Sequence, residues 1–180
     1  MRKIFNDFIK QYVRSLNDDI NILELEEAAK MIKEMQSRKG KIIFAGNGGS
    51  AAMASHVAVD FTKNASIRSI NFNEADLITC FANDYGYENW VKQAIEFYAD
   101  PEDLVFLISS SGNSMNMVNA ANYCNESNIN VITLSGFSDN NKLRKLGKTN
   151  FWVNSQEYNI VEMTHHIILL LLVDGFINEN

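Results

Sequence analysis

The sequence of 180 residues is poor in the residues that interrupt or cross-link a chain. It holds 1 proline, Pro101, and 2 cysteines, Cys80 and Cys124, which lack the CxxC spacing of a metal or redox motif. We therefore interpret both cysteines as reduced and structural, as in a cytosolic protein. With 46% hydrophobic and 21% charged residues, the composition is typical of a globular chain and excludes a disordered one.

Long apolar runs and an excess of positive charge are also missing. The longest apolar run, residues 167–173, is too short to cross a bilayer, and the first residues, MRKIFNDFIKQ, lack the apolar stretch of a secretory signal. The formal net charge is −6. We therefore expect a cytoplasmic protein with neither a nucleic-acid nor a membrane partner.

Segments with strand-like and helix-like patterns alternate along the chain. The expected strands lie at 42–44, 77–81, 104–108, 130–134 and 150–153. The expected helices lie at 2–16, 21–37, 51–60, 88–98, 114–127, 140–146 and 157–176. Because the strands are apolar throughout and alternate with helices, the sequence predicts a three-layer α/β fold whose five-stranded parallel sheet is covered on both faces.

The pattern predicts one domain over residues 1–180. Its α/β core would span 41–180, and a helical extension would span 1–40. The first helix carries an apolar stripe that needs a partner, either the surface of the same chain or another subunit. We expect it to serve in oligomer packing.

The stretch 42–60, IIFAGNGGSAAMASHVAVD, combines a strand, a glycine-rich turn and a helix. Glycines let the backbone approach an anion, and a helix N-terminus favours negative charge. The turn matches neither GxGxxG nor a P-loop, so no nucleotide cofactor is expected. A tight connection without a ligand explains the turn equally well. The helix after it brings His56 and Asp60 to one face, because they are four residues apart.

A second strand–loop–helix unit, residues 104–127, carries the serine-rich sequence SSSGNS at 109–114. Hydroxyls and N–H groups at a helix start suit a phosphate. A serine nucleophile is the rival interpretation, although the context is not GxSxG, and a helix cap without a ligand is another. Ligands bind beyond the carboxyl ends of parallel strands, so both loops and a polar loop at 82–87 are expected along one edge.

Three motifs in this order and spacing resemble the SIS (sugar isomerase) domain, and within it the phosphoheptose isomerases: GNGGS at 46–50, NDYG at 83–86 and SSSGNS at 109–114. The resemblance implies a flavodoxin-like fold and a homotetramer with sites between subunits. The implied reaction is aldose–ketose isomerisation of sedoheptulose 7-phosphate to a heptose 7-phosphate, for the heptose of lipopolysaccharide or capsule. In several members, the family also implies a zinc ion.

The resemblance also implies roles for individual residues. Phosphate binding is implied for the serine loop, and sugar contacts are implied for the other two motifs. The implied substrate-binding residues are Asn47, Gly48, Gly49, Ser50, Asn83, Asp84, Ser109, Ser110, Ser111, Asn113 and Ser114. His56 matches a metal ligand. Asp60 stands where the family has a glutamate that is both metal ligand and catalytic base, and its shorter side chain displaces the carboxylate.

The closing helix departs from the family pattern. Val161 and Leu169 occupy the positions of the family's glutamine and histidine, and neither side chain binds a metal or carries a proton. Glu162 and His166 nearby are four residues apart, with His165 adjacent. Buried polar groups in such an apolar helix need partners.

Two interpretations of this helix stay open. In one, a glutamate–histidine pair joins helices and has no other role. In the other, Glu162 and one histidine meet His56 and Asp60 at a subunit junction, where two histidines and two carboxylates suit Zn²⁺.

Three functions follow from the sequence. The preferred one is a sedoheptulose 7-phosphate isomerase, with Asp60 or Glu162 as the base and His165 or His166 as the partner acid. The second is an isomerase of a different phosphosugar, suggested by the altered closing helix. The third is a phosphosugar-binding or scaffold protein without catalysis, of the type that binds a replication initiator.

Overall fold

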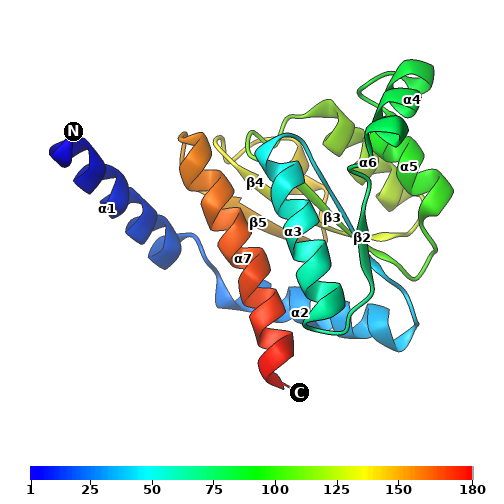
Figure 1. Cartoon of the computed structure of the whole chain (residues 1–180), viewed down its shortest axis with the longest axis horizontal. Helices are drawn as coiled ribbons and strands as arrows, with labels where there is room; N and C mark the ends of the chain where they lie inside the picture. The colour runs from blue at the N-terminus through cyan, green and yellow to red at the C-terminus, as the bar shows by residue number, and fades with distance from the viewer. Residues whose placement is uncertain (180) are drawn as a thin grey trace.

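The computed structural model describes residues 1–179 and holds a 5-stranded parallel sheet in the order β2-β1-β3-β4-β5 (Figure 1). The strands are β1 Ile42–Gly46, β2 Ser69–Asn71, β3 Leu104–Ser109, β4 Asn130–Gly136 and β5 Thr149–Val153. The register pairs Gly46 with Ile108 and Ser109 with Ser135, so the carboxyl ends of the central strands share one edge. The predicted parallel sheet is confirmed.

Helices cover both faces of this sheet. One face carries α2 Ile22–Ser37, α3 Gly49–Lys63 and α7 Tyr158–Glu179, and the other carries α5 Trp90–Tyr98 and α6 Met115–Glu126. The remaining elements are α1 Arg2–Asp18, α4 Ala75–Tyr85 and the short 3₁₀ helix η1 Leu143–Lys145.

Alternate residues of each central strand enter opposite cores. Phe44 and Phe106 pack together beneath α2, α3 and α7, with ring centroids 5.0 Å apart. Ile43 and Val105, next to them in the chain, pack beneath α5 and α6. Because every residue of β1 and β3 is buried, these strands are almost continuously apolar, which is why their pattern predicts a covered sheet.

The predicted second strand at 77–81 is wrong, because these residues lie inside α4. Leu77, Ile78 and Phe81 face the core at helical spacing, while Thr79 and Cys80 between them are exposed. A short apolar run does not distinguish a strand from a helix. The edge strand is instead β2, which pairs with β1 through only three residues, Ser69 to Asn71.

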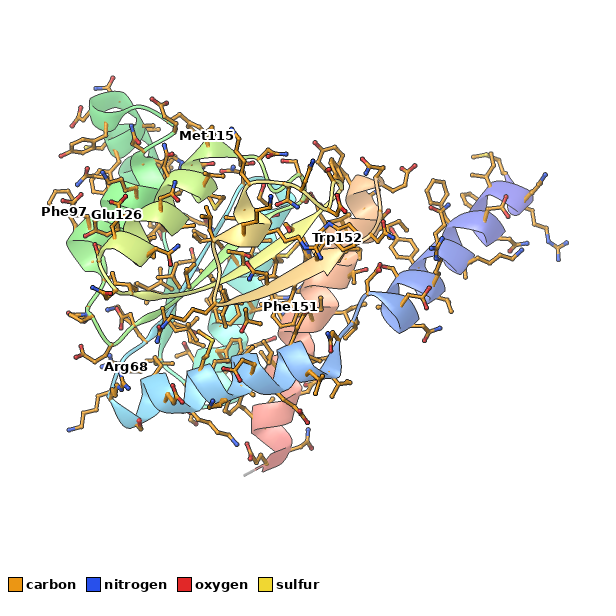
Figure 2. All side chains as sticks on the ribbon, turned by 180° about the vertical axis from the view of Figure 1, so that it is seen from behind. Arg68, Phe97, Met115, Glu126, Phe151 and Trp152 are labelled. Carbon is orange, nitrogen blue, oxygen red and sulfur yellow. The ribbon has the colours of Figure 1, made fainter. Side chains whose placement is uncertain are left out.

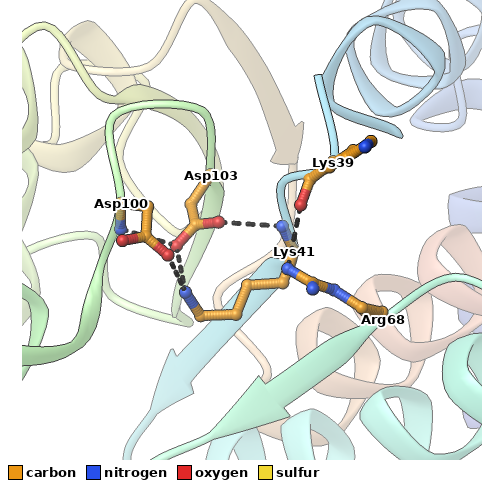
Figure 3. Close-up of polar contacts among 5 residues, drawn as sticks. All are labelled: Lys39, Lys41, Arg68, Asp100 and Asp103. Carbon is orange, nitrogen blue, oxygen red and sulfur yellow. Dashed lines mark hydrogen bonds and ion pairs between the residues drawn. The ribbon is translucent and has the colours of Figure 1, made fainter. Parts of the chain in front are cut away.

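A buried carboxylate fixes the amino ends of β1 and β3 (Figure 3). Asp103 is fully buried and accepts hydrogen bonds from the backbone N–H groups of Lys41 and Asp100, each at 2.8 Å. The Lys41 ammonium forms ion pairs with both Asp103 and Asp100. A buried charge of this kind is tolerated because it is both paired and hydrogen-bonded.

The N-terminal helix α1 extends away from the body of the molecule (Figures 1 and 2). Its last turn is attached to α7, where the hydroxyls of Ser15 and Thr164 are 3.0 Å apart. Phe5, Ile9 and Val13 on α1 are more than half exposed. The apolar stripe predicted from the sequence is therefore present and uncovered within this chain.

Helix α7 is the one helix within residues 1–179 that is long and apolar enough to cross a membrane. Half of its apolar window is buried inside the protein, including Ile168, Leu169 and Leu172, which pack against α2, α3 and the sheet. This burial accounts for its apolar sequence as that of a core helix.

Candidate functional site

The glycine-rich turn connects β1 to α3 at the carboxyl edge of the sheet. Gly48 precedes the helix with φ of 55°, a left-handed conformation that glycine adopts readily. As a glycine, Gly48 provides no side-chain cap to this helix start. Asn47 is held by Asn116 of α6 and by the hydroxyl of Tyr87. The turn is therefore anchored by residues from two other segments.

The serine loop connects β3 to α6 beside that turn. Ser109 donates to Ser114 Oγ at 3.0 Å, and Ser111 Oγ accepts from the N–H of Asn113 at 3.2 Å. The side chain of Ser114 does not cap α6, and the N–H groups of Met115 and Asn116 are left for another acceptor, whereas that of Met117 donates to the Ser114 carbonyl and to Asn116 Oδ1. Met115, the first residue of α6, lies at the upper edge in Figure 2.

The segment 141–143, which follows β4, packs against the serine loop and holds it by hydrogen bonds. The N–H of Leu143 donates to the Gly112 carbonyl at 2.9 Å, and the N–H of Lys142 donates to Asn113 Oδ1 at 3.3 Å. The buried Asn141 side chain packs directly against Gly112, whose φ is 64°. Asn141 was not predicted as a site residue, because its contact with Gly112 is tertiary and has no local sequence signal.

Glu162 reaches from α7 to the start of α3. Its carboxylate occupies the space that a side chain on Gly49 would fill. The Ser110 hydroxyl lies 3.5 Å from Glu162 Oε1. The carboxylate thus stands between the glycine-rich turn and the serine loop, at a helix N-terminus that favours negative charge.

His56, Asp60 and His166 form a cluster of polar side chains between α3 and α7. His56 Nδ1 is 2.9 Å from His166 Nε2, and His56 Nε2 is 3.1 Å from Asp60 Oδ2. The other oxygen of Asp60 accepts from the Asn64 amide at 3.1 Å. The sequence brings His56 and Asp60 together on α3, and the fold adds His166.

The hydrogen bond between the two histidines needs one protonated and one unprotonated nitrogen. The assignment that places the His56 Nε2 proton toward the Asp60 carboxylate leaves Nδ1 of a neutral His56 as the acceptor and makes His166 Nε2–H the donor. Burial, and next the nearby His56, lower the pKa of His166, while Asp60 opposes them. His166 is thus neutral near pH 7, and its Nδ1 has no hydrogen bond from residues 1–179.

His165 lies apart from His56, Asp60 and His166. It is fully buried, and its Nε2 is 2.9 Å from the Ser135 carbonyl. Burial lowers its pKa to about 4. The expectation that His165 is a partner acid has no support from this position, because a neutral ring closed to solvent does not reach a substrate. Val161 and Leu169 are likewise buried in the core.

The residues predicted to bind zinc do not fit the ion as they are arranged here. His56 Nδ1 is hydrogen-bonded to His166 Nε2, and His56 Nε2 lies 3.1 Å from the Asp60 carboxylate. Across residues 1–179, no group of three or more His, Cys, Asp or Glu side chains is placed to hold a metal. Glu162 is directed to Gly49 and Ser110.

Asn83 and Asp84 do not form the polar loop expected at 82–87, because they lie in the last turn of α4. Both are exposed, and Asn83 donates to Asp84 at 2.9 Å. The irregular part of the segment begins at Gly86, where φ is 84°. Tyr87, which follows, was not predicted as a site residue, yet it is the one that contacts the glycine-rich turn.

Comparison with known proteins gives the family. A model of the SIS domain matches residues 5–136. The phosphoheptose isomerase of Aneurinibacillus thermoaerophilus is 30% identical over 188 aligned positions, which cover 94% of each chain. That of Haemophilus ducreyi is 31% identical over 87% of this chain and 85% of its own.

Solved structures agree in fold. The phosphoheptose isomerase of Neisseria gonorrhoeae superposes with a TM-score of 0.90 at 24% identity, covering 97% of this chain and 98% of its own. The Vibrio vulnificus protein NanR, complexed with ManNAc-6P, superposes with a TM-score of 0.71 at 17% identity, over 98% of this chain and 62% of its own. The chain therefore belongs to the SIS domain family and, within it, to the phosphoheptose isomerases.

Proposed function

We propose that this protein is an aldose–ketose isomerase that converts sedoheptulose 7-phosphate to a heptose 7-phosphate for surface-polysaccharide synthesis. The observation that carries the proposal is the meeting of three groups: the serine loop, the glycine-rich turn and the Glu162 carboxylate between them. Relatives named for this activity align over nearly the whole chain, which supports the choice of substrate.

The serine loop holds the phosphate in this proposal. Its hydroxyls, from Ser109, Ser110, Ser111 and Ser114, and the uncapped start of α6 supply donors without a fixed positive charge. Glu162 already lies against the start of α3, so negative charge is accommodated there and the phosphate belongs at α6. Asn47 to Ser50 then line the sugar, with Asn113, Asn83 and Asp84 as further contacts.

Glu162 and His166 carry the protons in the proposed mechanism. They are one turn apart on α7. The glutamate takes the proton from C1 of the ketose to give an enediol and returns it to C2. His166 takes the proton from O1 and delivers it to O2, so that the carbonyl moves from C2 to C1 with no net gain or loss of protons.

His56 and Asp60 support His166. When Nδ1 of His166 accepts a proton, its Nε2 proton passes to His56 Nδ1, and the resulting positive ring is stabilised by Asp60. Asp60 therefore orients His56 in this proposal and is not the base. The shorter aspartate suffices for that role, since His56 is one turn away on the same helix.

No step uses zinc, because the residues predicted to bind it do not fit it. The elemental content of the purified protein tests that prediction.

We further propose that the protein acts as a cytoplasmic homotetramer in which α1 packs between copies. The support is the exposed apolar stripe on α1, whose residues gather on one side of the helix and are not scattered over the surface. A site between subunits would also cover the exposed face of His56.

The assay is direct. Purified protein is incubated with sedoheptulose 7-phosphate and the aldose product is measured, with and without added zinc. Turnover in both conditions is expected. No turnover in either would refute the proposal, and turnover of other ketose phosphates at higher kcat/KM would assign a different phosphosugar.

A second function, binding of a phosphosugar without catalysis, is favoured by one observation. The family positions for glutamine and histidine are held by Val161 and Leu169, both fully buried. This function predicts that sedoheptulose 7-phosphate raises the melting temperature while no isomerisation occurs.

A further inference from the structure

The side chain of Asn47 is held by the protein on two sides. Asn47 Nδ2 donates to Asn116 Oδ1 at 3.0 Å, and Asn116 Nδ2 donates back to Asn47 Oδ1 at 2.8 Å. The Tyr87 hydroxyl donates to the same Asn47 oxygen at 3.1 Å. Asn116 is 2% exposed and Tyr87 is 56% exposed, so one holds Asn47 from inside and the other from the surface.

These hydrogen bonds leave one donor of the Asn47 carboxamide unused. A carboxamide has two acceptor lone pairs and two N–H donors. Asn116 and Tyr87 occupy both lone pairs of the oxygen, and Asn116 takes one N–H. A single Nδ2–H of Asn47 remains, so this side chain meets a ligand as a donor only.

The reciprocal pair also connects the two ligand loops. Asn47 follows β1, and Asn116 is in the first turn of α6, directly after the serine loop. The strands that precede these loops are neighbours in the sheet, with Gly46 paired to Ile108. Asn116 lies outside the loops that the sequence singled out, and Tyr87 is the last residue of the polar loop expected at 82–87; together they fix where the remaining donor of Asn47 points.

We propose that Asn116, assisted by Tyr87, is a positioning residue that presents one Nδ2–H of Asn47 to an acceptor oxygen on the carbon chain of a sugar phosphate. The inference rests on the proposed function for the class of ligand, with the phosphate at the serine loop. A buried amide is held firmly, since losing its partner leaves an unsatisfied polar group. Inorganic phosphate, which has no carbon chain, does not use this donor.

The test compares two ligands on full-length protein by calorimetry. Asn116→Leu removes both amide bonds to Asn47, together with the bond from the Met117 N–H to Asn116 Oδ1, at similar side-chain volume. We expect the Kd for sedoheptulose 7-phosphate to rise about tenfold or more, while the Kd for inorganic phosphate stays within about twofold. Tyr87→Phe keeps the core intact, and the Kd for the sugar phosphate should rise roughly twofold to fivefold.

Asn119→Leu is the matched control. Asn119 is one turn further along α6 and donates to the Glu88 carbonyl at 2.9 Å and to Asn89 Oδ1 at 3.1 Å. This variant loses bonds between α6 and the segment that carries Tyr87 but leaves Asn47 untouched. It should bind both ligands as the wild type does.

The outcomes separate the two proposals. Unchanged sugar-phosphate binding in Asn116→Leu and Tyr87→Phe would overturn the inference. Equal weakening of both ligands would also overturn it, since that indicates a general collapse of the serine loop. Wild-type protein that binds the sugar phosphate without isomerising it would refute the proposed activity, while the comparison of variants still decides the role of Asn116.

Discussion

Glu162 owes its proposed role to its surroundings, since its carboxylate lies between two ligand loops. Glu162→Gln keeps the size and the hydrogen bond from Ser110 but cannot take a proton from carbon. We expect kcat with sedoheptulose 7-phosphate to fall by roughly 10²–10⁴. Glu157→Gln, which neutralises the glutamate just before α7, is the control and should keep wild-type rates. A fall of less than a few fold for Glu162→Gln would remove it from the mechanism.

The His56–His166 contact makes the two histidines one functional unit. If His56 acts only through His166, the loss of either interrupts the same proton path. The double variant His56→Asn with His166→Asn should therefore be no slower than the slower single variant, because effects within a unit are not additive. Steady-state rates of the three variants form the cycle. Multiplicative losses would mean that the two histidines act independently.

His165 makes stability depend on pH. Burial lowers its pKa from 6.5 to about 4 in the folded protein. Between these values the unfolded chain binds more protons, so the free energy of unfolding falls as the pH drops from 6.5 toward 4, by at most roughly 3 kcal/mol. Urea titrations across this range measure it. In His165→Gln, which keeps a donor for the Ser135 carbonyl, the slope should decrease; an unchanged slope would contradict the assignment.

At the scale of elements, the serine loop depends on one glycine. Gly112 has φ of 64°, and a Cβ there would overlap Asn141. Gly112→Ala should lower the free energy of unfolding by roughly 1–3 kcal/mol and weaken phosphate binding. Gly175→Ala in α7 is the control: its Cβ would meet nothing within 4 Å, and alanine should stabilise the helix by up to about 1 kcal/mol. Chemical denaturation distinguishes them, and equal stabilities for the two variants would contradict the loop's dependence on Gly112.

The sequence predicts most elements because periodicity and burial agree in them. The central strands are buried on both faces, so each is an unbroken apolar run. Residues 77–81 were wrongly predicted as a strand because a helix half-buried at i, i+1 and i+4 gives a similar run over five residues. The strand β2 was missed because three residues at a sheet edge carry too little pattern.

The site could be predicted from the sequence only where its residues are close together in the chain on one element. His56 and Asp60 share one helix, so their spacing is enough to pair them. His166 joins them through packing of α7 on α3, and the choice between His165 and His166 depends on the rotation of α7, which an almost uniformly apolar helix does not reveal. Asn116 and Tyr87 act through tertiary hydrogen bonds that have no local signature.

At the scale of the whole molecule, α1 is the helix whose apolar face stays largely uncovered by the rest of residues 1–179. The sheet and its covering helices bury their own apolar faces, whereas α1 contacts the body mainly where Ser15 meets Thr164 on α7. An isolated helix of 17 residues is marginal in water. Its stability must therefore come from packing of its apolar face, and a second copy of this chain is the partner that we propose.

The oligomer prediction follows from this exposed face. Phe5 and Phe8 are 57% and 39% exposed on the same side of α1. Replacing both with serine removes apolar contacts worth about 1.5–3 kcal/mol each if they are buried between copies. Light scattering should then show a shift toward the 20.4 kDa monomer on dilution. Lys3→Ser with Lys10→Ser alters the polar side of the same helix and should leave the assembly intact. An unchanged mass for the phenylalanine variant would place the interface elsewhere, and a monomeric variant with full isomerase activity would show that the site needs no second subunit.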